Sequence, residues 1–325
     1  MNGRLEKELK AENKMKERLS MLPSVFTEFY YSLEAEGKSY TTLNNYISHN
    51  VDFMNYITDN KLHDKCYLDV KTGDINQYMA SIRRKHHNGN VMRTGDDIRA
   101  ARWSSINSFF TFLKNNGYIS DNPVERTHRP KIKTEHKITY LNTEEISSVL
   151  NKIKTEATVK KMNRDLCLVS LALSTGLRVS AITQININDI DLSNNTINVI
   201  EKGGKIRIVR FGANLNQLIA DCIKDRNHYY PNAQTNALFL SQCQKRMTTQ
   251  AVRDLVSKYT VNIQGKHITP HKLRASAATN LAASGTSIQA IAKLLGHENI
   301  QTTRRYVEVL NSEEDNAINI LDSLI

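Results

Sequence analysis

The sequence predicts a mainly α-helical protein of two domains, a helical bundle followed by an α-rich domain with a small antiparallel β-sheet. The chain has 325 residues, about twice the length of a typical domain. Apolar residues recur at helical spacing along most of it, and β-branched runs typical of strands occur only in the second half. A basic, proline-containing stretch without apolar periodicity lies between the halves. The expected organisation is a charged segment at 1–21, a helical domain at 22–120, a linker at 121–137 and a second domain at 138–325.

The first domain is predicted to contain four helices. In the first, Phe26, Phe29 and Tyr30 begin an i, i+3, i+4, i+7 pattern that Leu33 completes, and Gly37 ends the helix. The second can be capped by Ser39, Thr41 or Thr42. Its apolar face consists of Leu43, Tyr46, Ile47, Met54 and Ile57. A shorter helix is expected near 72–82, and a fourth begins at acidic residues and ends at Gly117. Strand-like alternation is absent, which indicates an all-helical bundle.

The segment at 1–21 alternates charged residues with Leu5, Leu9, Met15 and Leu19. Two interpretations remain open, a frayed solvated helix or an arm that contacts a partner. We favour the helix, and we expect the folded structure to begin near Leu22.

The second domain is expected to open with a helix over TEEISSVLNKI, because Asn142 or Thr143 before Glu145 resembles a capping box. The apolar run RDLCLVSLALST predicts a buried helix that stops at Gly176. The short runs TINVI and KIRIVRF are joined by EKGG, which indicates a hairpin with a glycine turn. Helices are expected from there to the end.

Composition narrows the class of protein further. The formal net charge is +11, which indicates a polyanionic partner, most often nucleic acid, although a merely soluble basic protein is the alternative. The four cysteines have no CxxC spacing, so neither a disulfide framework nor a zinc site is expected and a reducing cytoplasm fits. No apolar run is long enough to span a bilayer, and the first residues contain no signal-peptide core.

Six polar residues have spacings that helix packing does not require. They are Arg178, Lys202, His271, Arg274, His297 and Tyr306. Taken singly, each has an ordinary explanation as a surface or packing residue. His271 and Arg274 are three residues apart and share a helix face. Because HExxH and Cys/His pairs are missing, we expect neither a metal nor a cofactor.

Together these residue types match a demanding reaction, the cutting of DNA without metal or nucleotide. A tyrosine hydroxyl can attack a phosphodiester and form a phosphotyrosyl bond that conserves the energy of the broken linkage. Two arginines can hold the non-bridging oxygens as negative charge develops. Histidines can donate hydrogen bonds or move the tyrosine proton, and a lysine can protonate the leaving 5′-oxygen.

The motifs that carry these residues resemble the tyrosine recombinase (phage integrase) family. They are TGLRVS, EKGGK, HKLR, LLGH and TTRRY, in that order. The resemblance covers nearly the whole chain. It implies an N-terminal SAM-like core-binding domain and a catalytic domain that opens at ITYLNTEEISSVL.

The resemblance implies a role for each residue. Arg178 and Arg274 would clamp the scissile phosphate, and His271 and His297 would bind it or assist proton transfer. Lys202 would be the general acid and Tyr306 the nucleophile, with Tyr259 as the next candidate.

Two positions depart from the family pattern. Ala181 stands where RxSE has a carboxylate, and Ala275 follows Arg274 where HxLRH has a histidine. Both belong to the supporting residues, so reaction rate and rigidity of the phosphate clamp are in question, but the roles are not.

The residues expected to contact DNA lie in both domains and the linker. They are Arg83, Arg84, Arg99, Arg102, Lys131, Lys133, Lys205 and Arg207. Arg99 and Arg102 are the strongest candidates in the first domain, because a helix along a groove presents such side chains to phosphates. The alternative for each is a solvated surface residue.

The function that follows is site-specific DNA recombination through a transient 3′-phosphotyrosine. The alternatives are a type IB topoisomerase-like enzyme, which acts alone, and an accessory DNA-binding protein of the same fold with impaired catalysis. An apolar stripe in residues 312–325 would either pack on its own domain or dock on a neighbouring protomer. The expected assembly is a homotetramer on two duplexes, and accessory DNA-bending proteins are a further candidate partner. The protein would be bacterial or phage-encoded and would act in the cytoplasm in association with the nucleoid, without a membrane partner.

Overall fold

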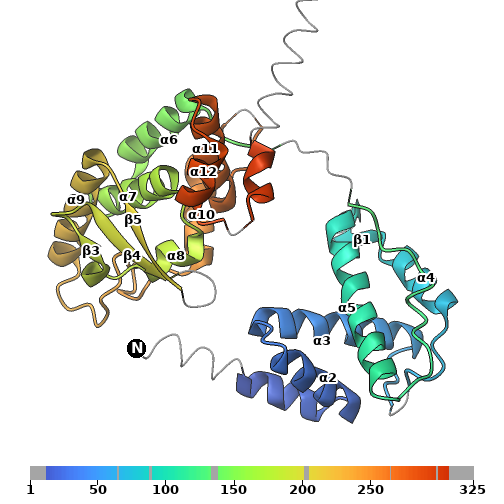
Figure 1. Ribbon diagram of the computed structural model, residues 1–325. Helices are drawn as coiled ribbons and strands as arrows, with labels where there is room; N and C mark the ends of the chain where they lie inside the picture. Colours follow the sequence, from blue (N-terminus) through green and yellow to red (C-terminus); the bar gives the residue numbers. More distant parts are fainter. Residues whose placement is uncertain are drawn as a thin grey trace, which may run out of the picture. The chain divides into compact units, whose positions relative to one another are not determined.

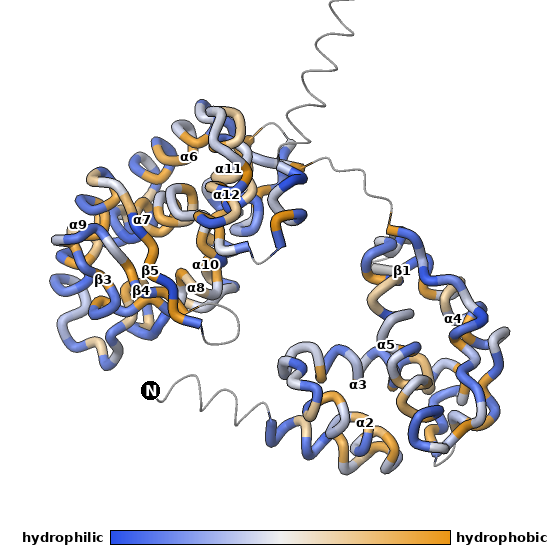
Figure 2. Tube along the Cα trace, viewed as in Figure 1, coloured by the Kyte–Doolittle hydropathy of each residue, from blue (hydrophilic) through white to orange (hydrophobic). Residues whose placement is uncertain are grey.

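The computed structural model describes residues 12–63, 66–87, 90–132, 138–200, 205–263, 265–297 and 299–306. The chain divides into two compact units, Met1–Thr134 and Glu135–Ile325, and each is described by itself. Both are built mainly from helices (Figure 1). Figure 2 shows hydrophobic and hydrophilic residues intermixed along the helices, as expected for helices that bury one face.

Unit 1 contains the four helices expected from the apolar periodicity. They are α2 (Ser24–Ala35), α3 (Tyr40–Ile57), α4 (Thr72–Ser81) and α5 (Asp96–Asn115). The expected cap of α3 is Ser39, whose side chain accepts a hydrogen bond from the Thr42 amide. The aromatic rings of α2 meet those of α5 in the core, where Phe26 stacks on Phe109 with ring centroids 5.2 Å apart.

A two-stranded hairpin also lies in unit 1, so the prediction of a unit without strands is wrong. Its strands are β1 (Arg84–His87) and β2 (Asn90–Arg93), which pair antiparallel. The sequence signal is the Asn-Gly pair at 88–89 between the strands, since Asn-Gly favours tight hairpin turns. These two residues lie outside the described part of the chain.

The core of unit 1 extends beyond the expected boundaries on both sides. Residues 12–20 form a helix, and Met15 and Leu19 on it are buried in the core. The expectation that folded structure begins near Leu22 is therefore wrong. At the other end, Asn122 and Val124 are fully buried, so the first part of the expected linker packs on this unit.

Among its described residues, unit 2 contains the helices α6 to α12, a further helical segment at 301–306 and a three-stranded sheet. The helices are α6 (Thr143–Glu156), α7 (Val159–Thr175), α8 (Val179–Gln184), α9 (Ala213–Tyr229), α10 (Thr249–Thr260), α11 (Pro270–Ala283) and α12 (Ile288–Leu295). The strands are β3 (Ile190–Asp191), β4 (Thr196–Ile200) and β5 (Ile206–Arg210), and a 3-10 turn at Ile187–Asp189 precedes them. The sheet order is β3-β4-β5, with both pairs antiparallel.

Local sequence explains where several of these elements begin and end. The expected capping box is present in α6, where the Asn142 and Glu145 side chains accept from each other's backbone amides. The helix α7 ends at Gly176, which adopts a left-handed conformation with φ of +59°. The expected strand runs TINVI and KIRIVRF contain β4 and β5, which pair with Ile200 opposite Ile206.

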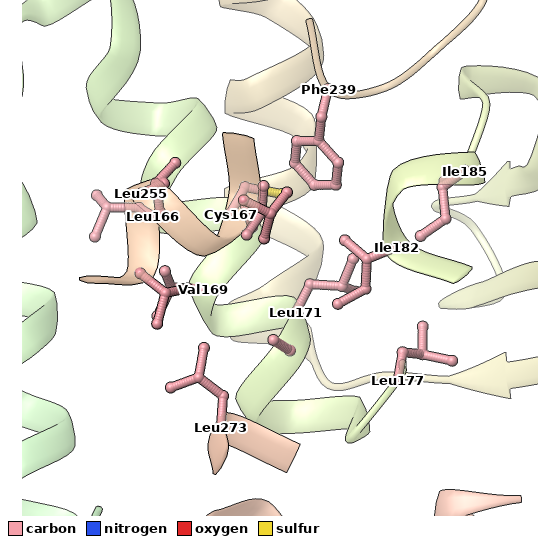
Figure 3. Packing of buried hydrophobic residues seen from close by; sticks show 14 of the residues in the cluster. Leu166, Cys167, Val169, Leu171, Leu177, Ile182, Ile185, Phe239, Leu255 and Leu273 are labelled. Atoms are coloured by element: carbon pink, nitrogen blue, oxygen red, sulfur yellow. The ribbon is translucent and has the colours of Figure 1, made fainter. Parts of the chain in front are cut away.

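The core of unit 2 surrounds α7, whose second half is almost wholly apolar (Figure 3). Leu166, Cys167 and Leu171 of α7 are buried, and Leu255 of α10 and Leu273 of α11 belong to the same core. The core thereby fixes the start of α11 against the C-terminal half of α7. In the described part of the chain, no helix has the length and apolar character needed to cross a membrane.

Candidate active site

The turn after α7 begins the candidate site, because it presents Arg178 next to Gly176. A Cβ atom at Gly176 would collide with the Leu295 side chain, so both the positive φ and the close packing favour glycine here. Leu177 then enters the core. Arg178 follows as the N-cap residue of α8, and its side chain is exposed.

The first turn of α11 supplies the HKLR motif. The Thr269 side chain caps this helix and Pro270 occupies its first turn, which fixes where the helix begins. His271 is at the exposed start, whereas Arg274 is one turn further on and only 2% exposed. Buried guanidinium groups need hydrogen-bond acceptors.

Arg274 finds these acceptors at the ends of two other helices. Its Nη1 donates to the carbonyl of Gly176 after α7, and its Nη2 donates to the carbonyl of Leu295 at the end of α12 (2.8 Å). Both are C-terminal helix ends, where the helix dipole favours a cation. The three helices α7, α11 and α12 therefore converge on one arginine.

The end of α12 places His297. Gly296 ends the helix in the left-handed conformation with φ of +65°. His297 Nδ1 shares a hydrogen bond with Thr303 Oγ1 at 2.7 Å, and Thr303 is fully buried. This bond fixes the orientation of the imidazole ring.

Tyr306 lies beside His297, in a helical segment described over residues 301–306. The two rings stack with centroids 6.4 Å apart and an angle of 17° between planes. Tyr306 is only 4% exposed and packs with Ala275 of α11 and with Leu295. The proposed nucleophile is therefore seated on the same two helices that position Arg274 and His297.

The electrostatics of the site favour an anion, because arginine charges surround both histidines. Burial and then the charges of Arg274 and Arg178 lower the pKa of His297 to about 4. Partial desolvation also lowers the pKa of His271, although its side chain keeps some exposure, and the charges of Arg274, Arg305 and Arg178 contribute. Both imidazoles are consequently neutral near pH 7, and the arginines carry the positive charge.

Arg305 is a residue that the sequence-based prediction missed. It is exposed, directly precedes Tyr306 and lowers the pKa of both His271 and His297. The signal in the sequence is the second arginine of TTRRY, directly before the tyrosine.

Tyr259, the alternative nucleophile, has a structural environment. It is 1% exposed, and its hydroxyl donates to Asp165 Oδ2 at 2.9 Å. Burial and the Asp165 carboxylate raise its pKa well above the usual value. A buried tyrosine held protonated in this way is a poor nucleophile.

The remaining candidates from the hairpin behave differently from one another. Lys202 lies outside the described residues. Lys205 is exposed, directly before β5. Arg207, expected to contact DNA, donates from Nη1 to the carbonyls of Lys293 (3.4 Å) and Leu294 (2.8 Å) at the end of α12.

In unit 1, the expected DNA-contact residues divide into two groups. Arg99 pairs with Asp96 at 3.0 Å, and Arg102 pairs with Asp52 at 3.1 Å and donates to the Tyr78 hydroxyl. Arg83, Arg84 and Lys131 are exposed. Lys133 lies outside the described residues.

A groove in unit 1 brings three of these residues together. It is lined by Asn76, Met79, Ala80, Arg83, Asp96, Arg99, Trp103, Thr127, His128, Arg129, Pro130 and Lys131. Trp103 is held in it by a hydrogen bond from its ring nitrogen to Thr127 Oγ1 at 2.7 Å. The sequence-based prediction missed His128 and Arg129, which add to the basic character of this groove.

The two departures from the family pattern are both buried. Ala181 belongs to the main core of unit 2, and Ala275 contacts the cluster around Tyr306. Across the described stretches of the chain, no group of three or more His, Cys, Asp or Glu side chains is arranged to hold a metal ion.

Comparison with known proteins identifies the class to which this fold and site belong. The profile of the phage integrase family matches residues 139–313, more than half of the chain. The chain therefore belongs to the phage integrase family and is a tyrosine-type site-specific DNA recombinase.

Individual relatives extend the match into unit 1. Tyrosine recombinase XerC of Caldanaerobacter subterraneus subsp. tengcongensis is 34% identical over 254 residues, which are 77% of this chain and 68% of that protein. Tyrosine recombinase XerC of Syntrophus aciditrophicus is 30% identical over 297 residues, which are 86% of this chain and 90% of that protein.

Solved structures share the fold at lower identity. XerH site-specific recombinase, bound to a palindromic difH substrate in a post-cleavage complex, superposes with a TM-score of 0.66 at 20% identity, covering 89% of this chain and 82% of that one. A lambda integrase (75–356) dimer bound to a COC′ core site superposes with a TM-score of 0.64 at 17% sequence identity. The match covers 86% of this chain and 96% of that one.

Proposed function

We propose that Tyr306 is the nucleophile of this recombinase and that Arg178 and Arg274 hold the scissile phosphate. His271 and His297, neutral near pH 7, donate hydrogen bonds to the phosphate or accept the tyrosine proton. Lys202, in the hairpin between β4 and β5, protonates the 5′-oxygen as it leaves. The product of cleavage is a 3′-phosphotyrosyl bond and a free 5′-hydroxyl, and attack by another 5′-hydroxyl reverses the step.

The observation that carries this proposal is the convergence of α7, α11 and α12 on Arg274. Its two hydrogen bonds place the end of α7, which leads to Arg178, next to the end of α12, which leads to His297. The same arginines depress the pKa of both histidines. Fixed positive charge beside neutral imidazoles suits an incoming phosphodiester, whose charge increases in the transition state.

The test is a suicide substrate, a duplex with a nick that lets the cleaved strand diffuse away and traps the covalent adduct. The wild-type protein is expected to form a protein–DNA band in EDTA, since arginine and lysine supply the charge. Lys202→Ala should cleave the normal substrate slowly and be rescued by a 5′-bridging phosphorothiolate, whose sulfur leaves without protonation. No adduct from the wild-type protein, a metal requirement or equal defects on both substrates would contradict the assignments.

We further propose that double-stranded DNA binds to both units. In unit 1, the groove lined by Arg83, Arg99 and Lys131 offers positive charge and the Trp103 ring. In unit 2, Lys205 flanks the hairpin that carries Lys202. The relatives are bacterial recombinases, which supports action on bacterial or phage DNA in the cytoplasm.

The proposed assembly is a homotetramer on two duplexes, because strand exchange between two sites requires four cleavages. A topoisomerase-like enzyme needs only one protomer. The tail at 312–325, outside the described residues, is proposed to dock on the neighbouring protomer.

A further inference from the structure

The C-terminal end of α12 has an unusual set of hydrogen-bond donors. The last four carbonyls of a helix have no partner within the helix and must find one elsewhere. Two of them are satisfied by the turn itself, because the His297 amide donates to Ala292 (3.0 Å) and the Gly296 amide to Lys293 (3.2 Å). This pair of backbone hydrogen bonds is the usual arrangement when a glycine ends a helix.

Side chains from distant segments satisfy the other two carbonyls. Arg207 Nη1 donates to Leu294 at 2.8 Å, and Arg274 Nη2 donates to Leu295 at 2.8 Å. Each guanidinium also gains from the negative end of the helix dipole. Arg274 belongs to the proposed phosphate clamp, whereas Arg207 has no assigned part in the reaction.

Because Arg207 belongs to the sheet, its hydrogen bond to Leu294 connects the hairpin with the end of α12. Arg207 is the second residue of β5, opposite Val199 of β4, and it lies five positions after Lys202 in the sequence. The Arg207 side chain thus links β5, which carries its backbone, to the last turn of α12, where its guanidinium donates hydrogen bonds. His297 is three residues after Leu294, so movement of that turn moves the imidazole.

We propose that Arg207 is a positioning residue, which holds the end of α12 so that His297 meets the scissile phosphate. It acts through helix carbonyls and not as a DNA contact. The activity part of this inference rests on the proposed function of His297, but the structural part does not. Loss of Arg207 frees the last turn of α12, while α11 and His271 keep their place.

The first experiment follows the imidazoles without DNA. The pKa of both histidines is measured by NMR titration in the wild type, Arg207→Ala and Arg207→Lys. Arg207→Ala is expected to raise the pKa of His297 from about 4 toward the ordinary value of about 6.5, because the ring becomes more solvated. The pKa of His271 should stay the same. Arg207→Lys, which can still donate to one carbonyl, should give an intermediate value.

The second experiment measures single-turnover cleavage and the salt dependence of binding on the suicide substrate. Arg207→Ala should cleave about tenfold to a hundredfold more slowly, as expected when a catalytic group is displaced by about 1 Å. The phosphorothiolate should not restore the rate, because the defect lies at His297 and not at Lys202. Arg210→Ala, an exposed arginine on the same strand, is the matched control and should retain wild-type cleavage.

Each failure has a separate meaning. A drop of about 1 in the slope of log affinity against log salt for Arg207→Ala would identify Arg207 as a phosphate contact and overturn the proposal. An unchanged pKa of His297 would overturn it as well, as would wild-type cleavage. If Arg207→Ala does not fold, judged by thermal melting, the Lys variant supplies the comparison. Absence of an adduct with the wild-type protein would instead contradict the proposed function and leave the NMR result standing.

Discussion

At the scale of single residues, Tyr306 and Tyr259, both buried in unit 2, have opposite environments. Tyr306 lies beside a neutral imidazole, and the hydroxyl of Tyr259 is committed to Asp165. Tyr306→Phe should therefore abolish the covalent adduct and leave DNA affinity nearly unchanged, because one hydroxyl is a small part of a large phosphate interface. The measurement combines a suicide-substrate gel with a binding titration.

The matched control is Tyr259→Phe. This variant should still form the adduct but lose about 1–3 kcal/mol of stability, because the Asp165 carboxylate loses a buried donor. An adduct formed by Tyr306→Phe and missing from Tyr259→Phe would reverse the assignment.

The depressed pKa of His297 makes a second prediction at this scale. The pKa of His297 is about 4 in the folded protein and about 6.5 in the unfolded chain. Between about pH 4 and pH 6.5 the native state therefore binds fewer protons than the unfolded state. The contribution of His297 to stability is therefore full above pH 6.5 and is lost as the pH falls toward about 4. The urea midpoint of the wild type should decline over that range, and NMR should place the His297 titration near 4.

A variant of Arg305 tests whether nearby positive charge lowers the pKa of the two histidines. Because its charge lowers the pKa of both histidines, Arg305→Gln should raise the pKa of both, although burial should keep that of His297 below 6.5. Arg304→Gln is the control, since Arg304 is the adjacent exposed arginine and is not among the charges that act on either histidine. Equal effects of the two variants would show that only the net charge matters.

At the scale of elements, the close packing between the end of α7 and α12 sets the site geometry. Gly176→Ala should destabilise unit 2 in two ways, through its left-handed backbone at about 1–2 kcal/mol and through collision with Leu295. It should also slow cleavage, because the carbonyl of Gly176 is an acceptor of Arg274. Urea unfolding and single-turnover cleavage measure the two effects.

Gly285→Ala separates these causes. Gly285 ends α11 with φ of +78°, but a Cβ there meets nothing within 4 Å. It should lose stability by the backbone cost alone and retain cleavage. If the two variants behave alike, the contact between Gly176 and Leu295 has no role in positioning Arg274.

These elements also show which features the sequence could predict. Helices such as α2 and α6 were predictable because their apolar spacing and caps are local. Arg178, His271 and His297 were predictable because each stands at a helix end marked by glycine, proline or threonine. The acceptors of Arg207 and Arg274 were not predictable, because they are backbone carbonyls brought close only by tertiary packing. The hairpin β1–β2 was missed although its Asn-Gly signal was present.

At the scale of the whole molecule, each unit has its own buried core. The core of unit 1 includes Phe26 and Phe109, and that of unit 2 includes Leu171 and Leu273. Separate fragments 1–134 and 135–325 should consequently each show a cooperative thermal transition. Each should bind DNA with a smaller salt slope than the intact chain, because each contacts fewer phosphates. A fragment without a transition would show that the units stabilise each other.

Assembly is the last property of the whole molecule that the sequence addresses. In residues 312–325, an apolar stripe of Ile318, Leu321 and Leu324 alternates with polar residues at helical spacing. Such a short helix is marginal in water by itself and needs a surface on which to bury its stripe. A head-to-tail contact closes into a ring only if every protomer donates one tail and accepts one.

Deleting residues 312–325 should therefore leave a folded protein that binds a single site but forms no higher-order complex and exchanges no strands. Gel shifts, a recombination assay and thermal melting measure these properties. Replacing Ile318, Leu321 and Leu324 with serine should reproduce the defect, whereas Asn316→Ala with Asn319→Ala, on the opposite face of the helix, should not. Recombination at the wild-type rate by the truncated protein would indicate that the tail has no role between protomers. Loss of the cooperative transition would instead show that the stripe belongs to the core of its own unit, because burial of each large apolar side chain contributes about 1.5–3 kcal/mol there.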